Sequence, residues 1–116
     1  MGLFTTTSAK SFHVTDAPDV ARRIVDRMTV DDGAPNGLPP LVVAGRTAPG
    51  HFNAMSPVAV FDSQFEVTSD GRGGSFVTEK KTAGSPIPFF SNVATAIHDV
   101  ATDPRSAYFR ARNRDG

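Results

Sequence analysis

Apolar and polar residues alternate most clearly between positions 61 and 82, in the segment FDSQFEVTSDGRGGSFVTEKKT. A period of two is typical of β-strands, and the glycine-rich stretch at the centre of the segment predicts a tight reversal between two of them. Glycine tolerates the positive φ angles that such a reversal requires. We therefore expect an antiparallel hairpin, with Arg72 exposed at its tip.

The register of this hairpin determines which side chains enter the core. Pairing Ser69 with Gly74 sorts nearly all apolar residues of the hairpin to one side of the sheet. The expected core face consists of Phe65, Val67, Phe76 and Thr78. The opposite face places Glu66 and Glu79 diagonally across from each other, and two carboxylates can act as acid and base when they are buried. Their polar neighbours favour a solvated face instead, so we expect no catalysis there.

A short strand and a helix are predicted near the N-terminus. Residues 10–15 alternate, with Phe12 and Val14 on one face. In the next segment the apolar residues recur at helical spacing, and Asp16 is placed to cap the helix. The expected apolar stripe comprises Ala17, Val20, Ala21, Ile24, Val25 and Met28, and the outer face carries Arg22, Arg23, Asp26 and Arg27.

The middle of the chain reads as loops separated by short apolar strands. Glycine and proline break both periodicities in residues 31–40 and again in residues 46–57, which predicts two irregular segments. The apolar runs 41–44 and 58–61 predict buried strands, the second joined to the hairpin by a bulge at residues 62–64. The first run could lie parallel to the N-terminal strand, because the connection is long enough for a crossover.

Two further elements are expected after the hairpin. The proline-containing segment 83–90 breaks the sheet, and Ser91 is placed to cap a helix over residues 92–102 that Pro104 ends. The last segment, residues 106–114, alternates as a strand. One of its faces carries Ala107, Phe109 and Ala111, and the other carries Tyr108, Arg110, Arg112 and Arg114.

These elements predict a single α+β domain over residues 1–116, with a mostly antiparallel sheet of about five or six strands and two helices packed on one face. The 12 basic residues balance the 12 acidic ones, so the overall charge does not call for a polyanionic partner. The absence of cysteine excludes disulfides and thiol chemistry. The N-terminal residues lack the features of a signal peptide and no run could cross a bilayer, so we expect a soluble cytoplasmic protein without a membrane partner.

Candidate chemistry is sparse in this sequence. His13, His51 and His98 do not have the spacing, to one another or to a carboxylate cluster, that indicates a metal site. The segment GRGGS lacks the lysine and the helix that complete a phosphate-binding loop, and no nucleophile elbow is present. We therefore expect no catalytic residue, no metal and no cofactor, although His51 in the irregular segment 46–57 leaves a ligand site there open.

Two groups of residues are candidate contact surfaces. Basic and aromatic side chains gather in the C-terminal segment, a composition that suits phosphates and stacked bases or an acidic protein partner. Its candidate contact residues are Arg105, Tyr108, Arg110, Arg112 and Arg114. The adjacent Phe89 and Phe90 precede a helix cap and cannot easily both point inward, so one of them is a candidate anchor for another chain.

A non-catalytic binding or assembly protein is the function that these observations favour, acting through self-association or as an accessory component of a larger complex. Two alternatives stay open. One is a nucleic-acid-binding module that uses the arginine-rich C-terminal strand. The other is a small enzyme or ligand-binding domain with a pocket near residues 46–57.

Overall fold

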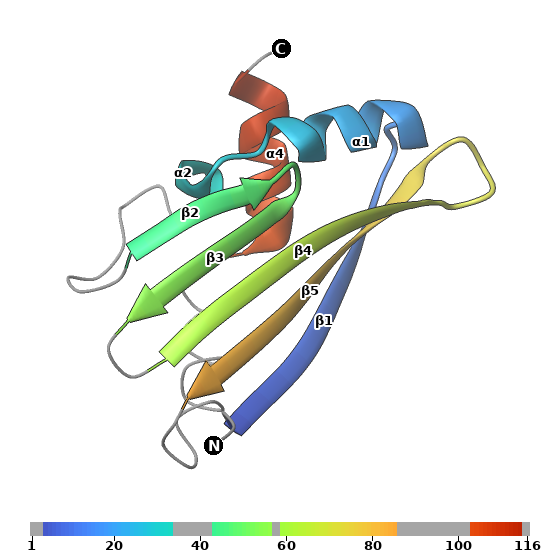
Figure 1. The fold of residues 1–116 in the computed structure, drawn as a ribbon. Coiled ribbons are helices and arrows are strands. Elements are labelled where there is room, and N and C mark those ends of the chain that lie inside the picture. The colour runs from blue at the N-terminus through green and yellow to red at the C-terminus, as the bar shows by residue number, and fades with distance from the viewer. Residues whose placement is uncertain (1–3, 34–42, 57–58, 86–102, 115–116) are drawn as a thin grey trace.

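The computed structural model describes residues 4–33, 43–56, 59–85 and 103–114, which form a five-stranded sheet and three helices (Figure 1). In chain order the elements are β1 (Phe4–Val14), α1 (Pro18–Arg27), α2 (Val30–Gly33), β2 (Val43–Ala48), β3 (His51–Ser56), β4 (Ala59–Ser69), β5 (Ser75–Ser85) and α4 (Pro104–Arg114). The strand order is β1-β5-β4-β3-β2, and every neighbouring pair is antiparallel. The predicted α+β fold is confirmed.

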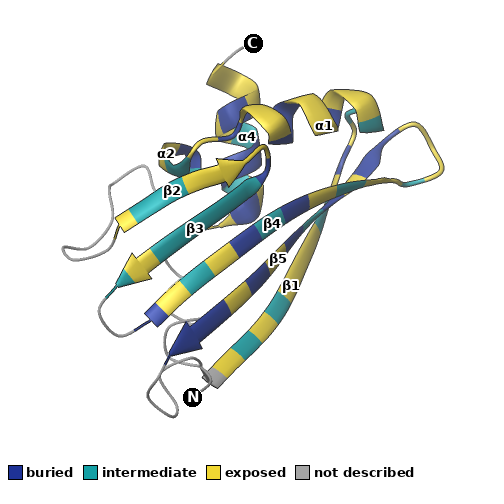
Figure 2. Ribbon diagram, viewed as in Figure 1, coloured by how far each residue is buried: buried dark blue, intermediate teal, exposed yellow. Residues whose placement is uncertain are grey.

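The helices gather over one end of the sheet, beside the turn between β2 and β3 (Figure 1). Their buried residues join one face of the sheet in a single core, whose members are Val14, Ala21, Ile24, Val25, Met28, Phe65, Val77, Ala107, Tyr108 and Ala111. Buried and exposed positions alternate along much of β4 and β5, as expected for a sheet packed on one face (Figure 2). None of the described helices is long and apolar enough to cross a membrane.

The hairpin of β4 and β5 forms with a register one residue away from the predicted one. Ser69 pairs with Ser75 instead of Gly74. A slip of one residue moves every side chain of a strand to the other face. Phe76, predicted in the core, is therefore 43% exposed on the outer face, and Val77 is fully buried in its place.

The turn of this hairpin explains the slip. Its backbone is held by the Asp70 carboxylate, which accepts hydrogen bonds from the amides of Arg72 at 2.6 Å and Gly74 at 2.9 Å. Gly71 and Gly73 have φ angles of 79° and 89°, so both use the freedom that glycine provides. This wider loop keeps Gly74 out of the strand pairing and leaves Arg72 exposed at the tip, as predicted.

The segment 46–57 is largely part of the sheet, which corrects its interpretation as an irregular loop. Residues 43–48 and 51–56 form the antiparallel pair β2 and β3 around a tight turn. Gly50 in that turn has a φ of 73°, and a Cβ there would lie 3.0 Å from the side chain of Val25. The turn can pack beneath α1 because this position is a glycine.

The strand order corrects three further predictions. β1 and β2 run in the same direction but lie at opposite edges of the sheet, so they do not pair as a crossover unit. β4 pairs with β5 without interruption, so the bulge predicted at residues 62–64 is wrong, and the described irregularity lies between Arg46 and Ala48. β5 also continues to Ser85, beyond the point where the sheet was expected to end.

The C-terminal segment is a helix and not the predicted strand. Pro104, interpreted as a helix end, begins α4, because the first amides of a helix need no internal partner. The Asp103 carboxylate accepts hydrogen bonds from the Arg105 amide at 3.2 Å and the Ser106 hydroxyl at 2.9 Å, as an N-cap does. The further buried side chains of α4 have helical spacing: Ala107, Tyr108 and Ala111.

Helix α1 confirms most of its predicted stripe, but not its cap. Its N-cap is Ala17, which makes no side-chain hydrogen bond, and Asp16 instead directs its carboxylate to α4. Val20 is 37% exposed, although it was expected in the stripe. Ala17 is half-buried, and the remaining stripe residues are buried: Ala21, Ile24, Val25 and Met28.

Several predictions concern residues outside the described ranges. These are the anchors Phe89 and Phe90, the helix over residues 92–102 with His98, and most of the loop over residues 31–40.

Candidate functional site

A buried tyrosine joins α4 to Asp16, which precedes α1 in the chain. Tyr108 is fully buried, and its hydroxyl donates a hydrogen bond of 2.7 Å to Asp16 Oδ2. Arg112 Nε donates to both oxygens of the same carboxylate, at 3.1 and 3.3 Å. Burial and then the bond to Asp16 raise the pKa of Tyr108 above its ordinary value. The hydroxyl is therefore a permanent donor that fixes the position of α4.

A second carboxylate binds α4 from α2. Asp32 accepts two hydrogen bonds from Arg114 Nη1, at 2.6 and 2.7 Å, and one from the Thr29 amide at 2.8 Å. The carbonyl oxygen of Asp32 also accepts from Arg110 at 2.8 Å, and that of Arg27 accepts from Arg114 at 2.9 Å. Charge-assisted bonds of this kind are stronger than neutral ones. They hold the C-terminal half of α4 against α1 and α2.

The structure thus places all five C-terminal contact candidates on one helix and gives each a partner within the chain. Arg105, the fifth, lies over the ring of Phe109 at 5.3 Å from its centre. Four arginines on consecutive turns of a helix point in several directions, so they do not form the single basic face expected of a strand. Much of their charge instead holds α4 in place.

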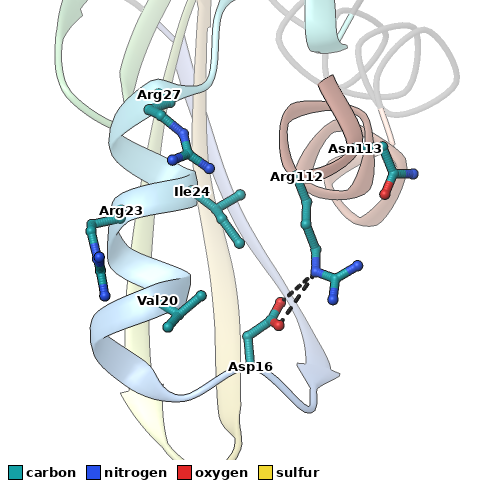
Figure 3. Close-up of a pocket in the computed structure, with 7 residues that line it drawn as sticks. All are labelled: Asp16, Val20, Arg23, Ile24, Arg27, Arg112 and Asn113. Atoms are coloured by element: carbon teal, nitrogen blue, oxygen red, sulfur yellow. Dashed lines mark hydrogen bonds and ion pairs between the residues drawn. The ribbon is translucent and has the colours of Figure 1, made fainter. Parts of the chain in front are cut away.

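A groove between α1 and α4 brings together basic side chains from both helices (Figure 3). Its volume is about 340 Å³, and it is lined by Asp16, Val20, Arg23, Ile24, Arg27, Arg112 and Asn113. Arg23 and Arg27 lie one turn apart on α1; the Arg23 side chain extends on the side of α1 away from α4, and Arg112 on α4 is directed at Asp16 (Figure 3). The lining residues therefore include three arginines, of which Arg23 pairs with Asp19 and Arg112 pairs with Asp16.

The sequence did not predict this groove, because the groove depends on how α4 packs against α1 in the tertiary structure. The spacing of Arg23 and Arg27 already placed them near each other on α1. Their proximity to Arg112 depends on α4 being a helix that docks through Tyr108, whereas the C-terminal segment was expected to be a strand.

The face of the sheet opposite the helices carries a second cluster. Four of the five large apolar side chains that are exposed in the described residues lie on it: Val43, Met55, Val60 and Phe76. Val43 pairs with Met55 and Met55 pairs with Val60, so these three side chains are neighbours across β2, β3 and β4. They are 74%, 54% and 38% exposed, respectively. We call this cluster of three the outer patch.

The predicted exposed pair of glutamates is wrong, because the register slip separates the two residues. Glu66 stays on the outer face and pairs with Lys80 at 3.1 Å. Glu79 lies on the inner face, where it accepts a hydrogen bond of 2.8 Å from Ser63 and forms an ion pair of 3.1 Å with Lys81. The side chains of Glu79 and Lys81 are 4% and 5% exposed. The two glutamates cannot share a proton.

The two described histidines occupy different structural settings. His13 Nε2 lies 2.6 Å from Asp70 Oδ2, and this hydrogen bond is the main reason why the pKa of Asp70 is lowered. His51 begins β3 and accepts a bond of 3.3 Å on its carbonyl oxygen from Thr47. Within the described ranges, no three His, Asp or Glu side chains are grouped so that they could hold a metal ion.

The sequence was compared with models of protein families and with curated sequences. No model of a known protein family matches the sequence. No significantly similar protein is found among curated sequences. The function must therefore be argued from the two surfaces described above.

Proposed function

We propose that this chain is a non-catalytic assembly protein that associates with a second copy of itself through the outer face of its sheet. The observation that carries the proposal is the outer patch of Val43, Met55 and Val60, which lies on the face that the described helices leave uncovered. Contiguous exposed apolar side chains on a folded domain mark surfaces that contact other molecules.

The size of this face is compatible with a stable interface. Strands lie about 4.8 Å apart; the three strands of 11 residues each extend about 36 Å, and β2 and β3, with 6 residues each, extend about 20 Å. The corresponding area of roughly 700 Å² approaches the 800 Å² or so that each partner buries in an interface of standard size. Fully burying a valine or methionine side chain is worth about 1.5–3 kcal/mol. The patch can thus supply the apolar centre of an interface.

The rest of the outer face suits the rim of such an interface. The outer face of β1, β4 and β5 carries hydroxyl groups, including the pair Ser11 and Thr78 with 2.7 Å between their oxygens, and the exposed ion pair of Glu66 and Lys80. Interfaces between copies place apolar residues at the centre and polar ones around them. A two-fold axis through the face would bring one patch against the other.

The arginine-rich helix supports the nucleic-acid alternative less well. Arg112 and Arg114 bind carboxylates of the same chain, so part of their charge is already compensated. A basic footprint for nucleic acid draws on uncompensated charge.

Light scattering coupled to size exclusion tests the assembly proposal. We expect the measured mass to rise from the 12.3 kDa of one chain toward twice that value as the protein concentration increases. Met55→Glu places a charge in the patch and should keep the protein monomeric. Arg22→Glu, which places a carboxylate on the exposed side of α1 and away from the outer face of the sheet, is the control and should behave like the unmodified protein. A monomer at every concentration, or equal effects of the two variants, contradicts the proposal.

A further inference from the structure

We propose that the outer face of the sheet binds single-stranded nucleic acid beside the turn between β4 and β5, where a base stacks on the rings of His13 and Phe76 and a phosphate meets Arg72. Phe76 pairs with Thr68, which lies eight residues from Val60 along β4, a distance of about 27 Å. The site and the outer patch therefore occupy opposite ends of the same face. This inference does not depend on the proposed self-association.

Two aromatic rings lie next to each other at this end of the outer face. His13 in β1 is the cross-strand partner of Phe76 in β5, and their ring centres are 5.3 Å apart. Phe76 is 43% exposed, and the side chain of His13 is 49% exposed. Exposed aromatic rings on a sheet are surfaces on which the bases of single strands stack, and they accept any base because every base has a π-face. The pair thus suits an unpaired base and not a base that is already stacked in a duplex.

Hydrogen bonds hold this surface in place before any ligand binds. His13 Nε2 lies 2.6 Å from Asp70 Oδ2, and Asp70 Oδ1 accepts hydrogen bonds from the amides of Arg72 and Gly74. The end of β1 and the turn that leads into β5 are therefore tied together. A surface that is already ordered loses little conformational entropy when a ligand binds. The two rings do not need the ligand to position them.

Arg72 supplies a positive charge that a phosphate can use. It lies in the turn that extends beyond the start of α1 (Figure 1), and its guanidinium forms no hydrogen bond or ion pair with the residues that the structure describes. The Asp70 side chain in the same turn is only 9% exposed, and its oxygens already have the partners given above. The next charges on the outer face of this hairpin, Glu66 and Lys80, form an ion pair with each other at 3.1 Å. A phosphate therefore meets an uncompensated cation here.

The remaining side chains at this end of the face favour a nucleic acid over a protein partner. Ser11 and Thr78 continue the face next to the two rings, and their hydroxyl oxygens are 2.7 Å apart. Hydroxyl groups bond to base edges, sugars and phosphates. A stable protein interface would need roughly 800 Å² on each partner with an apolar centre. In the described strands β4 and β5, Phe76 is the only exposed large apolar side chain besides Val60 of the outer patch.

Fluorescence anisotropy at low salt tests this inference. The probe is a fluorescein-labelled oligothymidylate, and the control probe is an abasic oligonucleotide of the same length, which keeps the phosphates and lacks the bases. We expect the oligothymidylate to bind about tenfold more tightly than the abasic strand, because the stacking of one base accounts for a difference of that size. Raising the salt concentration should weaken both complexes.

Matched variants locate the binding site. Phe76→Leu keeps an apolar side chain and removes the π-face, so it should weaken binding of the oligothymidylate by about tenfold. Val43→Ala trims an exposed apolar side chain at the other end of the same face and should leave binding within about twofold of the unmodified protein. Arg72→Gln should reduce the slope of log affinity against log salt concentration by about 0.7, the value for one phosphate of a single strand, whereas Arg22→Gln on α1 should not change it. Thermal melting of each variant confirms that the fold is retained.

Any of these results would overturn the inference: no binding of the oligothymidylate at low salt, equal binding of the abasic strand, equal losses in the Phe76 and Val43 variants, or a Phe76→Leu protein whose oligomeric mass changes while its binding does not. The last result would assign the ring to a contact between copies. The failure of this site is distinguishable from a failure of self-association. The oligomeric mass depends on Met55, whereas oligonucleotide binding depends on Phe76 and Arg72.

Discussion

Replacing Tyr108 with phenylalanine removes one hydroxyl group from a fully buried site and leaves the ring to pack as before. The lost hydrogen bond, 2.7 Å long, has a charged acceptor in Asp16, and such bonds contribute about 1.5–3 kcal/mol net. Arg112 still pairs with that carboxylate, so no buried charge is left without a partner. We expect the free energy of unfolding to fall by about 2 kcal/mol, and Tm by about 8 °C for a domain of this size.

Urea denaturation followed by far-ultraviolet circular dichroism measures this change. A double-mutant cycle that combines Tyr108→Phe with Asp16→Ala isolates the coupling between the two groups, which we expect to be about 1–2 kcal/mol. Arg105→Gln is the control on the same helix, because Arg105 is exposed and lies over the ring of Phe109. This variant should change the free energy of unfolding by less than about 0.5 kcal/mol. A Tyr108→Phe protein as stable as the original, or a coupling near zero, would refute the account of how α4 is held.

Three further changes probe the sheet. Lys81→Met should lower the free energy of unfolding by about 3 kcal/mol in urea titrations, because it removes the buried cation that pairs with Glu79 at 3.1 Å, and Glu79→Leu in the same chain should recover most of that loss. Gly74→Ala should lower Tm markedly in calorimetry, since the new Cβ would lie 2.7 Å from a backbone oxygen of β1; an unchanged Tm contradicts this. The bond from His13 lowers the pKa of Asp70 below its usual 3.8. The stabilisation that the Asp70 carboxylate provides is therefore complete above pH 3.8 and is lost as the pH falls through the lowered pKa. Asp70→Asn should reduce the acid-induced drop in Tm.

The fold class was predictable because strong periodicity survives errors in detail. The stripe of α1 at Ala21, Ile24 and Val25 and the alternation around Phe65 each identify an element and its buried face. A sheet with helices on one side follows from these elements. The identity of the strand partners does not, because β1 pairs with β5, at the far end of the described sheet from β2.

The register of β5 could not be obtained from hydrophobicity. Placing Phe76 inside and Glu79 outside is the choice that transfer free energies favour. The turn around Asp70 sets the opposite register, and Glu79 and Lys81 then share the inner face of β5 and neutralise each other at 3.1 Å. Two residues that would each be unfavourable in the core are tolerated there as a pair.

The C-terminal segment fits both periodicities, and its first residues decide between them. Ala107 and Ala111 belong to the buried face in either interpretation, since they are four residues apart. Asp103 as the cap and Pro104 in the first turn favour the helix. Because Pro104 was expected to end a helix, residues 106–114 were predicted to form a strand. The position of Arg112 in the groove could then not be predicted.

The self-association proposal is tested most directly by the methyl resonance of Met55 in a carbon–proton correlation spectrum recorded over a series of protein concentrations. Met55 is 54% exposed in the outer patch, whereas Met28 is 1% exposed in the core and serves as an internal reference. We predict that the Met55 methyl shift moves with concentration, together with the onset of the higher mass, and that the Met28 shift stays constant. A Met55 shift that does not change while the mass increases would place the interface elsewhere and contradict the account.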